Sequence, residues 1–235
     1  MNTPAAPRYL TIPRFSRISG LVHGFGTRHW TLDDLKKEKA GQGFSFVWLS
    51  QTHSDRIHFI DEPPRRRLQG DALATDRSGI FLIVKTADCL PVFIADESKG
   101  VIAAAHCGWR GTRQRILERL VREIAKRYGC EPASLLAAVG PSIGRACYEV
   151  GEDVRRSFKQ GGLDEDLFRP RRADKNGKYF LDLEEANRRQ LIGQGLRPRN
   201  ILSVSVCPHC DDRFFSYRRD RDKTARLFSF IGLNR

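Results

Sequence analysis

Two potential metal ligands follow apolar runs at points where strands are expected to end. Residues 101–105 are apolar, and His106 follows them before a turn with two glycines, Gly108 and Gly111, and an amphipathic segment. Upstream, the apolar residues 80–84 lead to Cys89. An imidazole and a thiol are therefore expected to meet at the edge of one sheet, beside a helix N-terminus that favours phosphate. This combination predicts an active site.

His53, within the sequence Gln-Thr-His-Ser-Asp, completes a possible set of three ligands with Cys89 and His106. A catalytic zinc uses three protein ligands and leaves one position for water, whose pKa it lowers toward ~7. The three residues are too far apart in sequence for their spacing to identify them as a set. Each also has a structural alternative: Cys89 as a buried thiol, His53 as a surface loop residue, and His106 as a hydrogen-bonded residue at a strand end.

The elements that must position these residues are short strands and two helices. Strands are predicted at 57–60, 80–85, 91–95, 101–105, 135–139 and 201–206. Several are apolar at consecutive positions, which indicates burial on both faces. A helix is predicted over 112–128, with Thr112 as its N-cap and Gly129 beyond its end. A second helix is expected to begin at Asp182, with Glu185 three positions later, and to end near Gly193 or Gly195. Residues 161–179 are predicted to form a long polar loop or insertion.

Composition indicates a soluble globular protein, and the predicted strands and helices indicate one mixed α/β domain. The 235 residues are 40% hydrophobic, and no apolar run approaches the ~18 residues of a membrane span. The first residues lack a secretory signal, so we expect a cytoplasmic protein whose six cysteines are ligands, nucleophiles or buried residues rather than disulfides. Residues 1–20 are interpreted as an N-terminal extension or edge segment, and 21–235 as one catalytic domain.

The net charge of +13 raises the possibility of nucleic-acid binding. However, the basic residues concentrate in loops at 64–67, 169–172 and 218–221, without the aromatic spacing of an RNA-binding sheet or a helix-turn-helix pattern. The charge is more simply explained as a basic surface that attracts a small anionic substrate. Neither a specific nucleic acid nor a membrane is expected as a partner.

Six motifs occur in order along the chain and carry a family resemblance. They are His23-Gly-Phe-Gly-Thr-Arg28, Gly70-Asp-Ala-Leu-Ala-Thr75, Thr86-Ala-Asp-Cys-Leu-Pro91, His106-Cys-Gly-Trp-Arg-Gly111, Gly140-Pro-Ser-Ile-Gly144 with Cys147-Tyr-Glu-Val150, and Phe215-Ser-Tyr-Arg218. Together they resemble the polyphenol oxidase or laccase-domain family, also described as purine nucleoside phosphorylases with adenosine deaminase activity. The resemblance extends from about His23 to the C-terminus.

The resemblance implies a family-specific α/β fold, a single layered domain of mixed β-sheets flanked by helices. It also implies that His53, Cys89 and His106 are zinc ligands. Cys107 departs from the family pattern, where alanine is usual, but alternation along a strand should direct it away from His106.

By the same resemblance, the substrates are inorganic phosphate and a purine nucleoside: adenosine, inosine, guanosine or methylthioadenosine. Arg110, just before the predicted helix, and Arg28 are candidates for phosphate binding. For deamination at purine C6, Asp71 is the first candidate for a catalytic proton shuttle, with Asp88 as a residue that orients a ligand imidazole. A monomer or weak homodimer is expected.

Two other functions remain open, a copper-dependent polyphenol oxidase and a hydrolase that edits peptidoglycan precursors. The chain has six histidines and Met1 is its only methionine. A complete multicopper centre cannot be built from so few histidines, and a blue-copper site would lack its usual axial methionine. Zinc is therefore favoured over copper.

Cys207-Pro-His-Cys210 resembles the motif of thiol oxidants, but only 25 residues follow it (235 − 210). A thioredoxin domain needs most of its strands after the motif. We interpret the two cysteines as a structural pair at a strand end, because no second Cys-x-x-Cys completes four metal ligands. Nearby, Tyr217 is a candidate to line the purine pocket, as is Phe44.

Overall fold

Two mixed sheets form the centre of the protein in the computed structural model, which describes residues 7–171 and 177–234. The five-stranded sheet has the spatial order β1 (Tyr9–Leu10), β2 (Leu21–Gly26), β14 (Leu227–Leu233), β6 (Ile80–Thr86) and β3 (Ser45–Trp48). The six-stranded sheet has the order β13 (Ile201–Ser203), β9 (Leu136–Val139), β7 (Leu90–Asp96), β8 (Val101–Cys107), β5 (Ala72–Thr75) and β4 (Ile57–Phe59). Both are mixed, because β3–β6, β13–β9 and β4–β5 are parallel pairs.

The two sheets pack face to face around a shared apolar core. Phe25 of the five-stranded sheet stacks on Phe93 of the six-stranded sheet, with ring centroids 4.7 Å apart. Leu82 and Ile231 from the first sheet join Ala104 from the second in the same core. Every residue of β7 and β8 is buried, which agrees with the prediction from their continuous apolar sequences.

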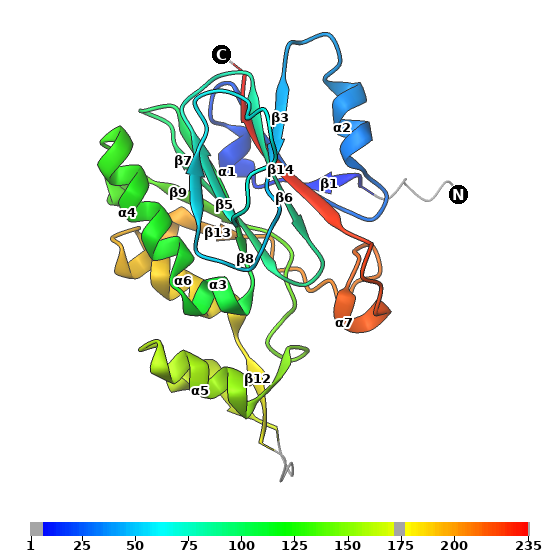
Figure 1. Ribbon diagram of the computed structural model, residues 1–235, viewed down its shortest axis with the longest axis vertical. Coiled ribbons are helices and arrows are strands. Elements are labelled where there is room, and N and C mark those ends of the chain that lie inside the picture. The colour runs from blue at the N-terminus through cyan, green and yellow to red at the C-terminus, as the bar shows by residue number, and fades with distance from the viewer. Residues whose placement is uncertain (1–6, 172–176, 235) are drawn as a thin grey trace.

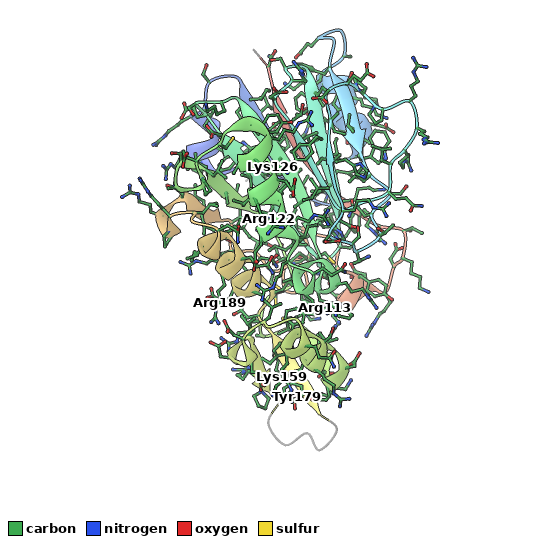
Figure 2. All side chains as sticks on the ribbon, turned by 60° about the vertical axis from the view of Figure 1, so that its left-hand side comes forward. Arg113, Arg122, Lys126, Lys159, Tyr179 and Arg189 are labelled. Carbon is green, nitrogen blue, oxygen red and sulfur yellow. The ribbon has the colours of Figure 1, made fainter. Side chains whose placement is uncertain are left out.

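Helices cover the outer faces of both sheets (Figure 1). On the six-stranded sheet lie α3 (Trp109–Arg113), α4 (Ile116–Tyr128) and α6 (Leu183–Gly193). On the five-stranded sheet lies α2 (Leu32–Glu38), whose Leu35 packs with Trp30 and Phe230. The solvent face of α4 carries Arg122 and Lys126, both labelled in Figure 2. The apolar stripe of the helix therefore faces the sheet and its basic residues face water.

The N-terminal segment packs on the two-sheet core. β1 pairs with β2, and α1 (Pro13–Ser16) buries Phe15 completely. The remaining short helices are η1 (Pro132–Ser134), η2 (Glu165–Leu167), η3 (Pro198–Asn200) and α7 (Tyr217–Asp220). Within the described residues, no helix has the length and apolar character needed to cross a bilayer.

A small third unit extends from the end of the molecule near α3 (Figure 1). It consists of α5 (Glu152–Gln160) and a three-stranded antiparallel sheet in the order β10 (Glu149–Gly151), β12 (Lys178–Leu181) and β11 (Phe168–Pro170). Its own core includes Phe158 and Leu181. The predicted loop at 161–179 is therefore wrong for β11 and the start of β12; residues 172–176 lie outside the described residues.

The predicted helix over 112–128 is correct at its end and wrong at its start. Gly129 has a left-handed φ of 64° and closes α4 as expected. However, Arg115 interrupts the helix with φ 61°, and its guanidinium donates to the carbonyls of Gly161 and Gly162. Thr112 lies inside α3, where its hydroxyl is hydrogen-bonded to Asn187. These distant contacts stabilise a break that the local sequence does not indicate.

The second predicted helix and five of the six predicted strands are confirmed, whereas the strand predicted at 201–206 ends at Ser203. The Asp182 carboxylate accepts a hydrogen bond from the Glu185 N–H at 3.0 Å and caps α6. All six predicted strands overlap strands of the structure. The architecture is the expected layered α/β fold with mixed sheets flanked by helices.

Candidate active site

Strand pairing brings the three predicted ligands together at one end of the two sheets. Because β3 and β6 are parallel, the loops after them begin at the same edge; the first carries His53 and the second carries Cys89. β7 begins directly after Cys89 and pairs antiparallel with β8, with Pro91 opposite His106. The ligand atoms of His53, Cys89 and His106 all lie within 4.8 Å of one another. The predicted set is therefore a cluster in space.

Asp71 organises this cluster from behind. It is fully buried, and its Oδ1 lies 2.9 Å from Nδ1 of His106. The carboxylate also accepts hydrogen bonds from the backbone N–H groups of His53, at 3.0 Å, and Ser54, at 2.6 Å. One side chain therefore fixes both the ring of one ligand and the loop that carries another.

The charges in the cluster favour a thiolate next to an imidazolium. Burial opposes ionisation of Cys89, but His106 and His53 outweigh it and lower the pKa of the thiol to about 6. Burial likewise disfavours charge on His106, but Cys89 and Asp71 raise the pKa of its imidazole to about 9. Asp71 has a pKa well below its ordinary value, because His106 and Ser54 outweigh its burial. The thiolate is the form that binds metals.

The two ligand loops adopt backbone conformations that are unusual outside glycine. His53 has φ 59° and Asp88, next to Cys89, has φ 88°. Such strain tends to occur at functional sites, where surrounding contacts hold it. Here the Asp71 carboxylate holds His53, and the Asp88 carboxylate accepts the backbone N–H of Arg218 at 2.7 Å.

Gly108 has no side chain, and this makes room for the side chains of His53 and Cys89. A Cβ atom built at this position would lie 2.9 Å from Cδ2 of His53 and 3.1 Å from Sγ of Cys89. Its φ of −77° is open to any residue, so close approach rather than backbone conformation requires glycine here.

The ligands line a cavity of about 420 Å³, a size typical of small-molecule sites. Its lining is formed by Gln51, His53, Lys85, Thr86, Ala87, Cys89, His106, Tyr217 and Arg226. Lys85 and Arg226 make it basic, and the burial of Lys85 together with Arg67 and Arg226 lowers the pKa of its amine. The buried Thr86 hydroxyl has no hydrogen-bond partner among the described residues. The cavity thus combines two imidazoles and a thiol with positive charge.

The two predicted phosphate-binding arginines do not contribute to this lining. Arg28 lies against the segment after β13, with its guanidinium 5.1 Å from the Phe215 ring centroid and 3.7 Å from Asp220. Arg110 is exposed in the first turn of α3 and stacks over Trp109 at 4.4 Å. Lys85 and Arg226 are not among the residues predicted from the sequence, because their only sequence signal is a basic residue at the edge of an apolar strand.

Other predicted neighbours are now placed. Tyr217 lines the cavity, as expected, whereas Phe44 packs on Phe81 in the outer core of the five-stranded sheet. Cys107 is fully buried in the core under the helices, so it points away from the cavity as strand alternation predicts. Asp71, and not Asp88, contacts a ligand imidazole.

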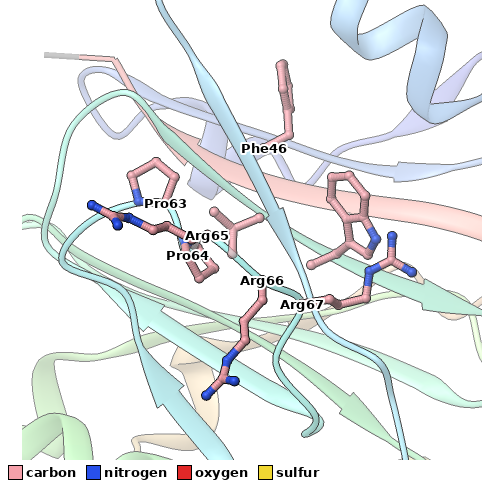
Figure 3. A pocket seen from close by; sticks show the side chains of 8 residues that line it. Phe46, Pro63, Pro64, Arg65, Arg66 and Arg67 are labelled. Carbon is pink, nitrogen blue, oxygen red and sulfur yellow. The ribbon is translucent and has the colours of Figure 1, made fainter.

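A second hollow, of about 240 Å³, lies over β3 and is lined by Phe46, Val47, Trp48 and residues 63–67. Figure 3 shows that the side chains of Arg65, Arg66 and Arg67 spread in different directions. Arg67 stacks on Trp48 at 5.2 Å. The lining contains no histidine, cysteine or carboxylate, so this hollow lacks the groups for metal chemistry.

Comparisons with known proteins place this site in a family context. The family described as multi-copper polyphenol oxidoreductase laccase matches residues 33–234. A protein named purine nucleoside phosphorylase from Deinococcus radiodurans is 40% identical over 199 residues, which are 83% of this chain and 74% of the relative. A protein named adenosine deaminase RL5, from an unknown prokaryotic organism, is 38% identical over 79% of this chain and 74% of its own length. The crystal structure of the hypothetical protein YfiH of Bacillus licheniformis superimposes with a TM-score of 0.87 at 32% identity, covering 98% of each chain.

Proposed function

The chain belongs to the multi-copper polyphenol oxidoreductase laccase family, and we propose that it is a zinc-dependent purine nucleoside phosphorylase with adenosine deaminase activity. The observation that carries the proposal is the convergence of His53, Cys89 and His106 on a basic cavity of about 420 Å³. The names of two relatives, a purine nucleoside phosphorylase and an adenosine deaminase, support both activities.

The donor set fits zinc. Two imidazoles and one thiolate are common zinc ligands, and a catalytic zinc held by three protein ligands would keep a fourth position for water or substrate. When bound, zinc supplies a Lewis acid that polarises the group at this open position. Copper fits less well, because the cavity lining contains no methionine and only two of the six histidines, too few for a multicopper centre.

We assign Asp71 as a positioning residue. Its carboxylate faces Nδ1 of His106, which would leave Nε2 of the ring to hold the metal. Asp71 is the first candidate for a proton shuttle from the sequence alone. That role fits poorly with a fully buried carboxylate whose oxygens already accept several hydrogen bonds and whose pKa is far below its ordinary value.

Phosphate would bind to Lys85 and Arg226, because these are the cationic side chains of the cavity that also holds the metal ligands. Phosphorolysis needs the phosphate close to the anomeric carbon, and charge-assisted hydrogen bonds hold it there. Arg28 and Arg110, the candidates from the sequence, lie outside the cavity lining. The aromatic ring of Tyr217, which also lines the cavity, remains for the nucleoside.

Product analysis with adenosine and inosine, each with and without phosphate, tests the proposal. We expect ribose-1-phosphate and free base only when phosphate is present, conversion of adenosine to inosine without phosphate, and loss of both in Cys89→Ala. Oxygen uptake on phenols with bound copper would support the oxidase instead. Absence of nucleoside turnover under all conditions would overturn the proposal.

A further inference from the structure

A second group of metal-binding side chains lies outside the cavity lining. Cys147 lies in the segment between β9 and β10. Its Sγ is 3.2 Å from Sγ of Cys210. A ring nitrogen of His209 joins them, and the three ligand atoms lie within 4.8 Å of one another. The group connects two segments that are 63 residues apart in sequence.

Cys207 adds a fourth donor next to this group. Its thiol is close enough to interact with the thiols of both Cys147 and Cys210. The backbone N–H of Gly144 donates to its Sγ at 3.1 Å, and the N–H groups of His209 and Cys210 also face it. A Cys-x-x-Cys turn that directs backbone N–H groups at its first sulfur suits a metal-bound thiolate.

We propose that Cys147, Cys207, His209 and Cys210 form a second metal site that binds zinc structurally. Three thiols and one imidazole match the tetrahedral Cys₃His set of closed structural zinc sites, and the spacing of Cys207 and Cys210 is within the usual range. Two sulfurs bound to one zinc at ~2.3 Å lie roughly 3.8 Å apart. The sulfur pair therefore needs to move by only a fraction of an ångström.

This site would fix one wall of the cavity. Residues 211–216 connect His209 and Cys210 to α7, which carries Tyr217 of the cavity lining. Arg219 of α7 donates to the carbonyl of Pro208 at 2.6 Å, and the N–H of Arg218 binds Asp88 next to Cys89. A metal that joins Cys147 to this segment would thus hold Tyr217 and Asp88 in fixed positions relative to each other. None of the four ligands lines the cavity, so metal binding here does not depend on the reaction proposed above.

Metal analysis in a Cys89→Ala background tests the site, because that substitution removes a ligand of the cavity site. The protein is purified under reducing conditions and dialysed against zinc. We expect about one zinc per chain, its loss in Cys89→Ala/Cys147→Ser, and its retention in Cys89→Ala/Cys130→Ser. Cys130 is a matched control, because it is a buried free cysteine beside Asp96. Absence of zinc from Cys89→Ala, or its persistence after Cys147→Ser, would overturn the inference.

A second measurement covers the case in which Cys147→Ser fails to fold. Cobalt is added to metal-free Cys89→Ala protein, and the expected result is the visible absorption of tetrahedral cobalt thiolate together with a higher Tm. Mass analysis after alkylation checks for the alternative, a disulfide between Cys147 and Cys210. Such a disulfide, together with no cobalt spectrum after its reduction, would contradict the metal site.

Discussion

Oδ1 of Asp71 lies 2.9 Å from Nδ1 of His106, and both side chains are almost completely buried. The backbone reinforces this contact, because the His106 N–H donates to the Asp71 carbonyl at 2.8 Å. The β5–β8 pairing, with Ala72 opposite Ala105, sets the two residues side by side. The sheet itself therefore fixes which imidazole nitrogen faces the cavity.

Asp71→Asn should lower zinc affinity by about 10–100-fold, the usual cost of losing a partner that orients a metal ligand. An amide carries no charge to hold the Nδ1 proton of His106. Its NH₂ group would also face backbone N–H groups of His53 and Ser54, which now donate hydrogen bonds to the carboxylate. Competition with a chromophoric chelator measures the affinity. Asp55→Asn, a neighbouring carboxylate paired with Arg119, is the control. Equal affinities in the two variants would refute the positioning role.

Gly108→Ala should weaken metal binding while the fold is retained. Its methyl group would press on the His53 ring and the Cys89 sulfur, whereas its backbone conformation suits alanine. Gly193→Ala is the matched control, since no atom lies within 4 Å of a Cβ there. Zinc titration and circular dichroism of both variants make the comparison. Normal zinc affinity in Gly108→Ala would show that the ligands are not packed as described.

Cys89 in the metal-free protein should be alkylated with a pH midpoint near 6. The thiolate reacts and the thiol does not, so the rate should be low below this midpoint and level off above it. The shift is downward because the positive charges of His106 and His53 outweigh burial. Mass spectrometry of the Cys89 peptide separates its rate from those of the other cysteines. A midpoint near the ordinary value of about 8.5 would contradict the thiolate–imidazolium pair.

Lys85→Gln and Arg226→Gln should each raise the KM for phosphate by about tenfold or more, as expected when a charge-assisted hydrogen bond is lost. The KM for the nucleoside should change much less. Arg28→Gln and Arg110→Gln serve as comparisons, because their side chains lie outside the cavity lining. Initial rates at varied phosphate give both constants. A larger increase in the KM for phosphate in Arg28→Gln or Arg110→Gln would instead support these two arginines, the candidates from the sequence, as the phosphate ligands.

The sequence predicts best those strands that consist of consecutive apolar residues, because such a run by itself indicates burial. β7 is apolar from Leu90 to Ala95 and β8 from Val101 to Ala105, and the sequence predicts both, as it predicts the cap at Asp182 from a local signal. β5 was missed, since its Ala-Leu-Ala-Thr sequence has little strand preference of its own and forms through pairing with β4 and β8. β14 was also missed, although its apolar run was a usable signal.

The family resemblance names His53, Cys89 and His106 together, and it names Asp71 only as a proton shuttle, not as the hydrogen-bond partner of His106. The contact of Asp71 with His106 spans 35 residues, and that of Cys147 with Cys210 spans 63. Contacts at such separations depend on strand order and loop paths, which one sequence does not reveal. The same holds for Arg226, whose place in the cavity lining follows no local pattern.

The most direct test of the central claim is the zinc dependence of inosine phosphorolysis. Metal-free protein is supplied with zinc or copper, and ribose-1-phosphate is measured in the presence of phosphate, with Cys130→Ser and Cys89→Ala alongside. If His53, Cys89 and His106 hold a catalytic zinc, zinc restores activity in the wild type and in Cys130→Ser, and Cys89→Ala stays inactive. Equal phosphorolysis without metal, or full activity in Cys89→Ala, would contradict that claim.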